Sequence, residues 1–337
     1  MIYRLDSLFK PRGILTNFES LIWHEKYYEC GNFEFHAPYS LKDTAYIYDN
    51  ELNLVGIVES VNQKEMQYVY KGHLVKGLLF NKVIPYTCTY RNVSAEYIVK
   101  DLIKKFNLYQ PHIEIEPSQN RGKTYDMLQV TGKNLLEYTD NLLKESELGA
   151  VIDYDFINNR LVYKVIKGTD NTSKKMPLCK NFNNIYSFTY TEDKGNFKNF
   201  AYVAGEKSNK ERVIVTVDLT TGYEKKEIYV DARDLQSTYT DENGNQVTMS
   251  DFQYQQALKQ RGLLKLNEYQ MRENIEVEPK ENLEIGEKRL FKDGKMVATH
   301  RVTEKITAYE ENRVKKTIVL GLKKIDRIDR LKREVKE

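Results

Sequence analysis

The chain has 337 residues, with 52 Lys and Arg against 49 Asp and Glu and a net charge of +3. This length predicts two or more packed units, and the interspersed charges disfavour a nonspecific DNA binder with one basic face. No window approaches the roughly 18 apolar residues of a membrane span, and the N-terminus lacks the apolar region of a signal peptide.

Residues 1–86 are predicted to form short β-strands. Three turn signals divide them, at Arg12-Gly13, Cys30-Gly31 and Asp49-Asn50. The segment 20–38 holds the only tryptophan of the chain and then alternates Phe33, Phe35 and Ala37 with polar residues, which is the period of a half-buried strand. We expect a small antiparallel barrel or sandwich here.

Residues 87–167 are predicted to form two capped helices and a hairpin. Ser94 stands as N-cap of the first helix, and Thr131 as N-cap of a second helix that ends at Gly149. The apolar stripe of the first helix contains Ile98, Leu102 and Phe106. A hairpin with its turn at Asn158-Asn159 follows, so we expect a compact α+β unit.

Residues 168–274 begin with a polar linker, 168–182, and continue into strands at FAYVA and VIVTV. The next segment is predicted to be a hairpin partner, with a turn at Thr221-Gly222. Ser250 and Gln253 have the spacing of a capping box, which predicts a third helix.

Residues 275–324 are predicted to be closing strands. Their last hairpin offers five residues to a core: Val302, Ile306, Val314, Ile318 and Leu320. The charged C-terminus, residues 325–337, has an apolar stripe at helical spacing made of Ile325, Ile328, Leu331 and Val335. Either this stripe docks on a partner, which would order so short a helix, or the terminus is frayed.

Residue patterns that support catalysis or metal binding are scarce. The five histidines form no HxH or HExxH pair, and the three cysteines form no CxxC, which is typical of thiols in a reducing cytosol. Asp153 and Asp155 could hold a metal or act as acid and base, but the alternation favours a solvent-facing pair. Thr131-Gly132-Lys133 resembles part of a phosphate loop without its strand context. We expect no catalytic residue, metal site or cofactor.

Five segments, in order, resemble motifs of a family of siphophage tail proteins. They are SLIWHEKYYECGNFEFHAP, GIVESV, TGKNLLEYTDNLLKESELGAVIDYD, NFKNFAYVAGE and EIYVDARDL. The resemblance covers about residues 1–325 and is to the Gp37-like group of siphovirus tail-tip proteins, which are similar to the hub domain of tail-associated proteins and to baseplate hubs of contractile tails. Gly286 is followed by charges where relatives keep an apolar strand, so an irregular closing barrel is expected.

The resemblance implies a mainly β, α+β fold of the baseplate-hub type. Two small β-barrel domains of tail-tube type would carry intervening α+β domains, divided as 1–86, 87–167, 168–274, 275–324 and 325–337. It implies a structural protein of the virion tail tip, made in the host bacterial cytoplasm and assembled as a homotrimer. The implied partners are the distal tail protein, the tape-measure protein and tip or receptor-binding proteins, without sequence-specific nucleic acid, cofactor or membrane span.

The aromatic segment near the N-terminus then becomes a candidate contact between ring subunits, because aromatic residues are enriched at such contacts. The candidate interface residues are Trp23, Tyr27, Tyr28, Phe33 and Phe35. Trp23 could equally fill the barrel core. Two alternative functions are a tail-associated cell-wall hydrolase and a receptor-binding module. Many relatives continue into a peptidase or lysozyme domain, whereas this sequence ends at residue 337, so we expect no enzymatic activity.

Overall fold

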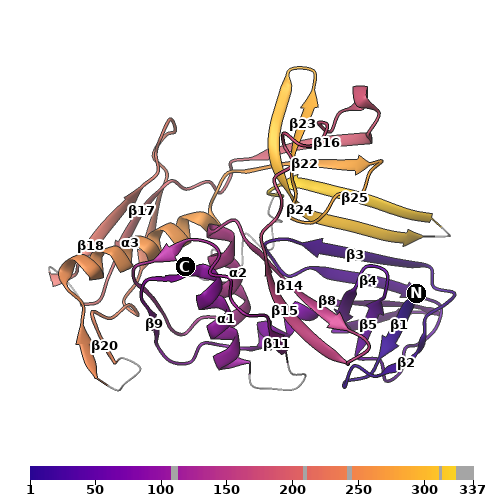
Figure 1. Ribbon diagram of the computed structural model, residues 1–337, viewed down its shortest axis with the longest axis horizontal. Coiled ribbons are helices and arrows are strands. Elements are labelled where there is room, and N and C mark those ends of the chain that lie inside the picture. Colours follow the sequence, from indigo (N-terminus) through magenta and orange to yellow (C-terminus); the bar gives the residue numbers. More distant parts are fainter. Residues whose placement is uncertain (108–112, 208–210, 241–244, 311–312, 324–337) are drawn as a thin grey trace.

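The structure is a computed structural model that describes residues 1–107, 113–207, 211–240, 245–310 and 313–323. Figure 1 shows large β-sheets at one end, helices in the middle and a smaller lobe with its own helix at the other end. The fold is mainly β, as predicted.

The largest sheet has eight strands along one path, and every neighbouring pair is antiparallel. In order, the strands are β16 (Ile185–Asp193), β22 (Arg272–Pro279), β25 (Arg313–Gly321), β24 (Met296–Glu310), β3 (Ser20–Lys26), β4 (Asn32–Ala37), β8 (Gln67–His73) and β7 (Ser60–Lys64). A ninth strand, β23 (Lys288–Asp293), pairs with the beginning of β24. We call the path from β16 to β7 the main sheet.

The main sheet joins strands from three of the predicted units. The β3–β24 pairing, with Trp23 opposite Thr307, connects the N-terminal and C-terminal parts of the chain. β16 lies in the predicted unit 168–274 but pairs with β22. Because the path has two ends, no barrel closes among the described residues of one chain, and the expectation of closed barrels is corrected in this respect.

A second sheet covers the β3–β4–β8 part of the main sheet, so the N-terminal unit is a sandwich. Its order is β2 (Pro11–Ile14), β1 (Ile2–Leu5), β5 (Tyr46–Asp49) and β6 (Leu54–Ile57). The turn signal at Arg12-Gly13 is wrong, because these residues lie in β2. The chain reverses earlier, where the Asp6 carboxylate accepts the N–H groups of Leu8 and Lys10.

The middle unit contains α1 (Ala95–Phe106) and α2 (Leu135–Glu145). Ser94 caps α1 as predicted, by accepting from the N–H of Tyr97. The cap of α2 is Asn134 rather than Thr131, because Asn134 Oδ1 accepts from the N–H of Glu137.

The predicted hairpin follows as β14 (Gly149–Asp155) and β15 (Arg160–Ile166), with Asn159 at a φ of 50° in its turn. Gly149 therefore opens β14 and does not end α2, which terminates at Ser146. The unit also contains three short pairings. β9 (Cys88–Tyr90) pairs with β13 (Leu128–Val130), β10 (Val93–Ser94) pairs with β12 (Thr124–Tyr125), and β11 (Ile113–Ile115) lies parallel to β15. The 3-10 helix η1 (Val75–Asn81) precedes this unit in the chain.

The small lobe is built on a three-stranded sheet with the order β18 (Ile214–Asp218), β17 (Phe200–Ala204) and β19 (Glu227–Asp231). β19 lies parallel to β17, on the side away from β18, so the predicted β18–β19 hairpin is wrong. The helix α3 (Asp251–Glu268) packs on this sheet and begins with the predicted Ser250–Gln253 capping box. β20 (Thr238–Thr240) and β21 (Gln246–Thr248) form a ribbon beside it, and the 3-10 helix η2 (Lys180–Phe182) lies in the segment that leads to β16.

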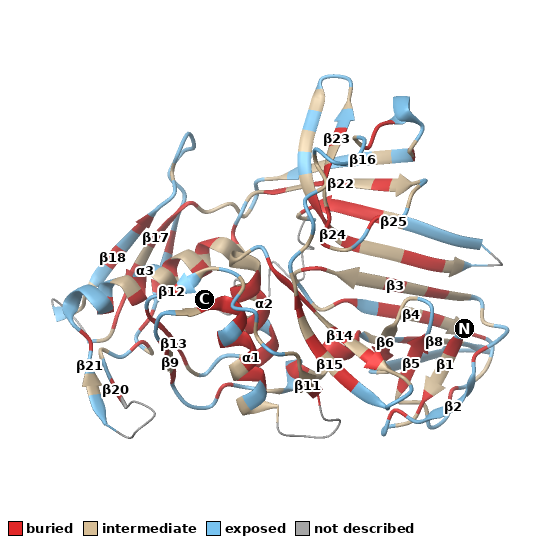
Figure 2. Ribbon diagram, in the orientation of Figure 1, coloured by how far each residue is buried: buried red, intermediate tan, exposed pale blue. Residues whose placement is uncertain are grey.

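Figure 2 shows alternating buried and exposed residues along the long strands. In the C-terminal hairpin, Val302, Ile318 and Leu320 are buried as predicted. Ile306 is only partly buried because it lies opposite His24 on the other side of the sheet. Val314 is 56% exposed because it lies near the hairpin end, beyond the core.

Candidate subunit interface

Three of the predicted interface residues, Trp23, Phe33 and Phe35, lie in the core of the N-terminal sandwich. Their exposures are 0, 2 and 0%, and the rings of Trp23 and Phe33 lie 5.3 Å apart. The strand alternation was therefore correct, and it faces these rings toward the second sheet. A side chain without exposed surface in one chain has none to bury against a neighbour. The core alternative for Trp23 is the one that the structure supports.

Tyr27 is also fully buried and connects three parts of the chain. Its hydroxyl accepts from the N–H of Gly168 and lies 3.1 Å from the carbonyl oxygens of Glu147 and Ile166. Tyr28 packs edge-on against Tyr27, and burial raises the pKa of Tyr28 to about 12. These two tyrosines hold the end of β3 to the middle unit and to the segment after it.

The opposite side of the main sheet is polar and carries paired charges. Because partner residues in a ladder point to the same side, His24, Glu34 and His36 face away from the aromatic core. Glu34 lies 2.6 Å from both His36 Nε2 and Lys71 Nζ. We call this side the polar face.

At the β3–β24 pairing, the polar face contains a nearly buried carboxylate. Glu304 Oε1 lies 2.7 Å from Nδ1 of His24, and Lys323 Nζ lies 3.7 Å from Oε2. Burial raises the pKa of Glu304, but the hydrogen bond to His24 and the charges of Lys323 and Lys26 outweigh it, so the pKa lies below its usual value of 4.5.

We predict that Glu304→Gln reduces the dependence of the free energy of unfolding on pH in the acidic range. A carboxylate whose pKa is lowered on folding contributes stability above its unfolded pKa and loses it as pH falls through the folded value. The wild type should therefore lose stability below about pH 5, and the variant should lose less over the same range. Urea unfolding at a series of pH values measures this, and equal slopes for both proteins would contradict it.

The main sheet ends in two strands whose outer sides pair with nothing in the described ranges: β7 and β16. Each carries an apolar side chain on the core side of the sheet. Val61 lies opposite Tyr70 and is 54% exposed, and Tyr190 lies opposite Ile275 and is 42% exposed. Unpaired edges are templates for another strand. The sequence analysis did not predict these edge strands, because a strand is an edge only by its long-range pairing, which local sequence patterns do not indicate.

The predicted docking stripe cannot be placed. Ile325, Ile328, Leu331 and Val335 lie outside the described residues. The stripe therefore stays a prediction.

The residues considered for metal binding or acid–base catalysis have structural roles. Asp153 pairs with Lys164 at 2.7 Å, and Asp155 pairs with Arg160 at 2.8 Å. Gly132 lies in the loop before α2 with a φ of 63°. No group of three or more His, Cys, Asp or Glu residues gathers into a metal site within the described part of the chain. None of the described helices is long and apolar enough to span a membrane.

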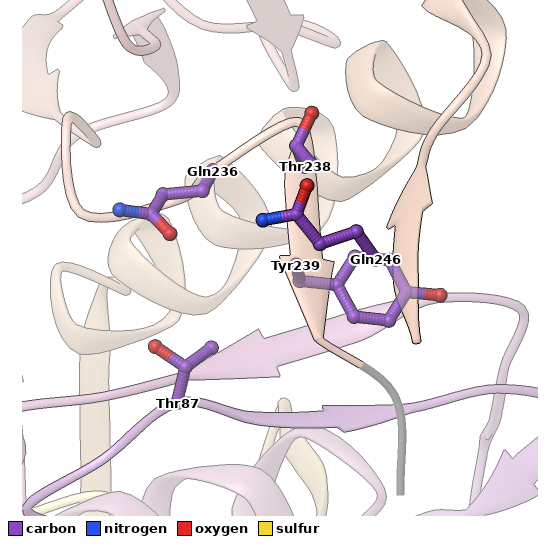
Figure 3. Close-up of a pocket in the computed structure, with 5 residues that line it drawn as sticks. All are labelled: Thr87, Gln236, Thr238, Tyr239 and Gln246. Carbon is purple, nitrogen blue, oxygen red and sulfur yellow. The ribbon is translucent and has the colours of Figure 1, made fainter. Parts of the chain in front are cut away.

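One cavity of about 260 Å³ lies between the middle unit and the small lobe (Figure 3). It is lined by Thr87, Gln236, Thr238, Tyr239 and Gln246. Hydroxyl and amide groups offer hydrogen bonds, but none of these five side chains is a carboxylate, histidine, lysine or cysteine that could serve as a general acid, base or nucleophile. The cavity therefore gives no support to a hydrolase.

Comparison with solved structures identifies the fold. The chain is similar to the prophage tail protein gp18 of Listeria monocytogenes EGD-e, with 18% identity, a TM-score of 0.58 and coverage of 99% of this chain and 98% of that one. It is also similar to the 43 kDa tail protein of prophage MuSo2 from Shewanella oneidensis, with 11% identity, a TM-score of 0.55 and coverage of 91% of this chain and 95% of that one. A tail protein of Neisseria meningitidis MC58 is similar as well, with 13% identity, a TM-score of 0.55 and coverage of 95% of each chain. No curated protein matches the sequence.

The fold is thus that of phage and prophage tail proteins. Residues 74–335 match the family described as Siphovirus ReqiPepy6 Gp37-like protein, and the chain belongs to this family. It is therefore a structural protein of the phage tail or baseplate type, as the ordered motifs of the sequence indicated.

Proposed function

We propose that this chain is a subunit of a homotrimeric ring at the tail tip, which joins the tail tube or distal tail protein to the tip and host-attachment apparatus. The observation that carries this proposal is the pair of unpaired edges, β7 and β16, at the two ends of one antiparallel sheet. The two edges differ, so a contact between them is head-to-tail, and such contacts form a ring when the rotation closes.

The strand directions fit this contact. Directions alternate along the eight strands of the path, so the first and the last strand run in opposite senses. β7 of one subunit and β16 of the next can therefore form an antiparallel pair. On the core side, Val61 would then lie near the exposed face of Tyr190, and both side chains would gain burial.

Three subunits would contribute 24 strands to the ring, eight from each main sheet. At about 4.8 Å per strand, the circumference is about 115 Å and the diameter about 37 Å before strand tilt. The polar face suits a solvated lumen, because its charges are paired side by side and need no burial. The small lobe would project outward.

The ring places this protein in the virion, after synthesis in the bacterial cytoplasm. Its neighbours would be the distal tail protein, the tape-measure protein and tip or receptor-binding proteins. The stripe of Ile325, Ile328, Leu331 and Val335 is a candidate docking element for one of them or for the other subunits. The proposal assigns no catalytic step to the chain.

We expect Val61→Asp and Tyr190→Asp each to prevent ring formation, since each places a carboxylate at the edge-to-edge contact. Ile157→Asp is the matched control, because Ile157 is 92% exposed in the β14–β15 turn. Incorporation of each variant into tails that lack the wild-type protein is measured, with melting temperature as the check on folding. Both edge variants should melt like the wild type and fail to enter tails. Normal incorporation of both would exclude the edge contact.

A further inference from the structure

A lysine and an aspartate form a buried pair between the N-terminal sandwich and the middle unit. Lys76 lies in η1, which follows the sandwich in the chain, and Asp140 lies in α2, against which η1 packs. Nζ of Lys76 lies 2.9 Å from Oδ1 of Asp140, although the two residues are 64 positions apart in the sequence. They are 5% and 8% exposed. The fold therefore holds an amine and a carboxyl group in contact with each other and largely away from water.

The surroundings of this pair favour neutral groups. Its neighbours on η1 and α2 are apolar and buried, and they include Val75, Leu79, Leu136 and Leu143. Two charges in such a place are stabilised only when further hydrogen bonds satisfy them. An ammonium group has three donors, yet in the described part of the chain Lys76 has no hydrogen-bond or ion-pair partner besides Asp140.

A second buried pair, Lys100 with Glu96, shows the contrast. Its charged groups lie 2.7 Å apart, and its side chains are 5% and 0% exposed. There the ammonium also donates to the carbonyl oxygen of Pro117 at 3.0 Å, and the carboxylate accepts from the N–H of Arg121 at 2.8 Å. Burial raises the pKa of Glu96, but the hydrogen bonds from Lys100 and from the backbone outweigh it, so the pKa lies below its usual value of 4.5. This pair stays ionic.

Asp140 lies in the opposite environment. Burial raises its pKa to about 6, in spite of the charge and the hydrogen bond of Lys76. Near neutral pH, a proton that passes from the ammonium to the carboxylate leaves a neutral amine beside a neutral carboxyl group. Tyr163 on β15 adds a buried hydroxyl without a hydrogen-bond partner among the described residues. Burial and the charge of Asp140 raise the pKa of Tyr163, so its hydroxyl stays protonated and can relay protons.

We propose that Lys76 and Asp140 are joined by an isopeptide bond, an amide between the two side chains. The lone pair of the neutral Nζ attacks Cγ of the neutral carboxyl group, and the bond between Cγ and its hydroxyl oxygen breaks. That oxygen takes a proton from the nitrogen and leaves as water, so no oxidant, reductant or further reactant is needed. The fold supplies proximity, which raises the effective concentration of the two groups. The product replaces two buried charges with one neutral amide, which costs less in apolar surroundings.

This cross-link would act on folding of the single chain. It closes the segment between positions 76 and 140 into a loop and ties η1 to α2, so the sandwich and the middle unit could not separate completely. A covalent loop also restricts the unfolded chain, which favours the folded state. The inference does not rest on the ring proposal, because the bond forms within one subunit before or without assembly.

The test is mass spectrometry of the purified full chain, intact and after digestion with trypsin. Trypsin cleaves after lysine and arginine, so an unlinked chain yields the separate peptides 72–76, 77–82 and 134–144. The isopeptide bond blocks cleavage after Lys76. We therefore expect one branched peptide made of 72–82 and 134–144, lighter than their sum by one water molecule. The intact chain should be lighter than its sequence by the same amount.

Three variants test the assignment. Lys76→Arg keeps a cation but removes the primary amine, so it should lose the branched peptide completely and melt at a lower temperature. Lys100→Arg is the matched control, because it changes the other buried lysine and should keep the branched peptide. Tyr163→Phe removes the proposed relay and should lower the linked fraction severalfold at equal times after synthesis. An unchanged fraction would exclude this hydroxyl from the reaction.

Two results would overturn the proposal. One is complete cleavage after Lys76 in the folded wild type together with an intact mass equal to that of the sequence, which would show that the pair stays ionic. The other is a branched peptide that persists in Lys76→Arg, which would place the linkage at another residue. Melting temperatures confirm that each variant is folded before it is digested.

Discussion

Replacing Trp23 by alanine should lower the free energy of unfolding by about 3–5 kcal/mol. The indole is fully buried between the two sheets of the N-terminal sandwich and packs on Phe33. Alanine would remove this packing and leave a cavity that the surrounding strands can fill only in part. Because Trp23 has no exposed surface, the expected effect is on folding of the single chain, measured by urea unfolding and by melting temperature.

Trp23→Phe separates the size of the ring from its polar group. The indole Nε1 is buried and has no hydrogen-bond partner in the structure. Phenylalanine keeps an aromatic ring and removes this unpaired donor, so it should cost clearly less than alanine. An alanine variant as stable as the wild type, or a phenylalanine variant as damaged as the alanine one, would contradict the core assignment.

Glu287→Ala should destabilise the C-terminal part of the main sheet by about 3–5 kcal/mol, because it breaks a buried ion pair and leaves the buried Arg289 with Glu281, a partly exposed carboxylate, as its remaining ion-pair partner. Glu287 and Arg289 are each 1% exposed, and their charged groups lie 3.3 Å apart. Glu287 Oε1 also accepts from Lys175 at 3.0 Å and from Asn171 at 2.9 Å. One carboxylate thus ties β23 to the segment after Gly168.

The matched control is Glu284→Ala. Glu284 lies three residues away, its side chain is 69% exposed, and its ion pair with Lys305 is 3.9 Å long. Exposed pairs of this kind contribute up to about 1 kcal/mol. Urea unfolding of both variants measures the difference. Equal stability of the two would show that the buried network around Glu287 does not stabilise the fold.

The sequence predicted best what local chemistry determines. Ser94 and Ser250 cap their helices because each hydroxyl bonds an N–H three residues away, and both were predicted from that spacing. The cap of α2 was misplaced because Thr131 and Asn134 are both good caps. Gly132 turns the chain between them at positive φ, so the helix begins only after Asn134.

Long-range pairing could not be predicted from the sequence. β3 and β24 are separated by about 280 residues, and neither strand has a sequence pattern that identifies the other as its pairing partner. The same holds for β19, which lies beside β17 in parallel although a turn signal suggested a hairpin with β18. The resemblance to tail proteins supplied the fold class, as the family match confirms.

The candidate interface shows the same limit. An aromatic strand is equally suited to a core and to a subunit contact, so the composition of 20–38 could not decide between them. Burial decides it: Trp23, Tyr27, Phe33 and Phe35 are covered within one chain. The contact that we propose instead is made by the backbone edges of β7 and β16, and no side-chain pattern in the sequence indicates such edges.

The central claim is a threefold ring closed by strand pairing between β7 and β16. An image reconstruction of the intact tail tip by electron cryo-microscopy, at a resolution that separates β-strands, tests it most directly. The account predicts three copies of this chain around the tail axis, joined edge to edge into one continuous 24-stranded wall with the polar face toward the lumen. A ring of two, four or six copies, or three copies whose β7 and β16 edges do not meet, would contradict it.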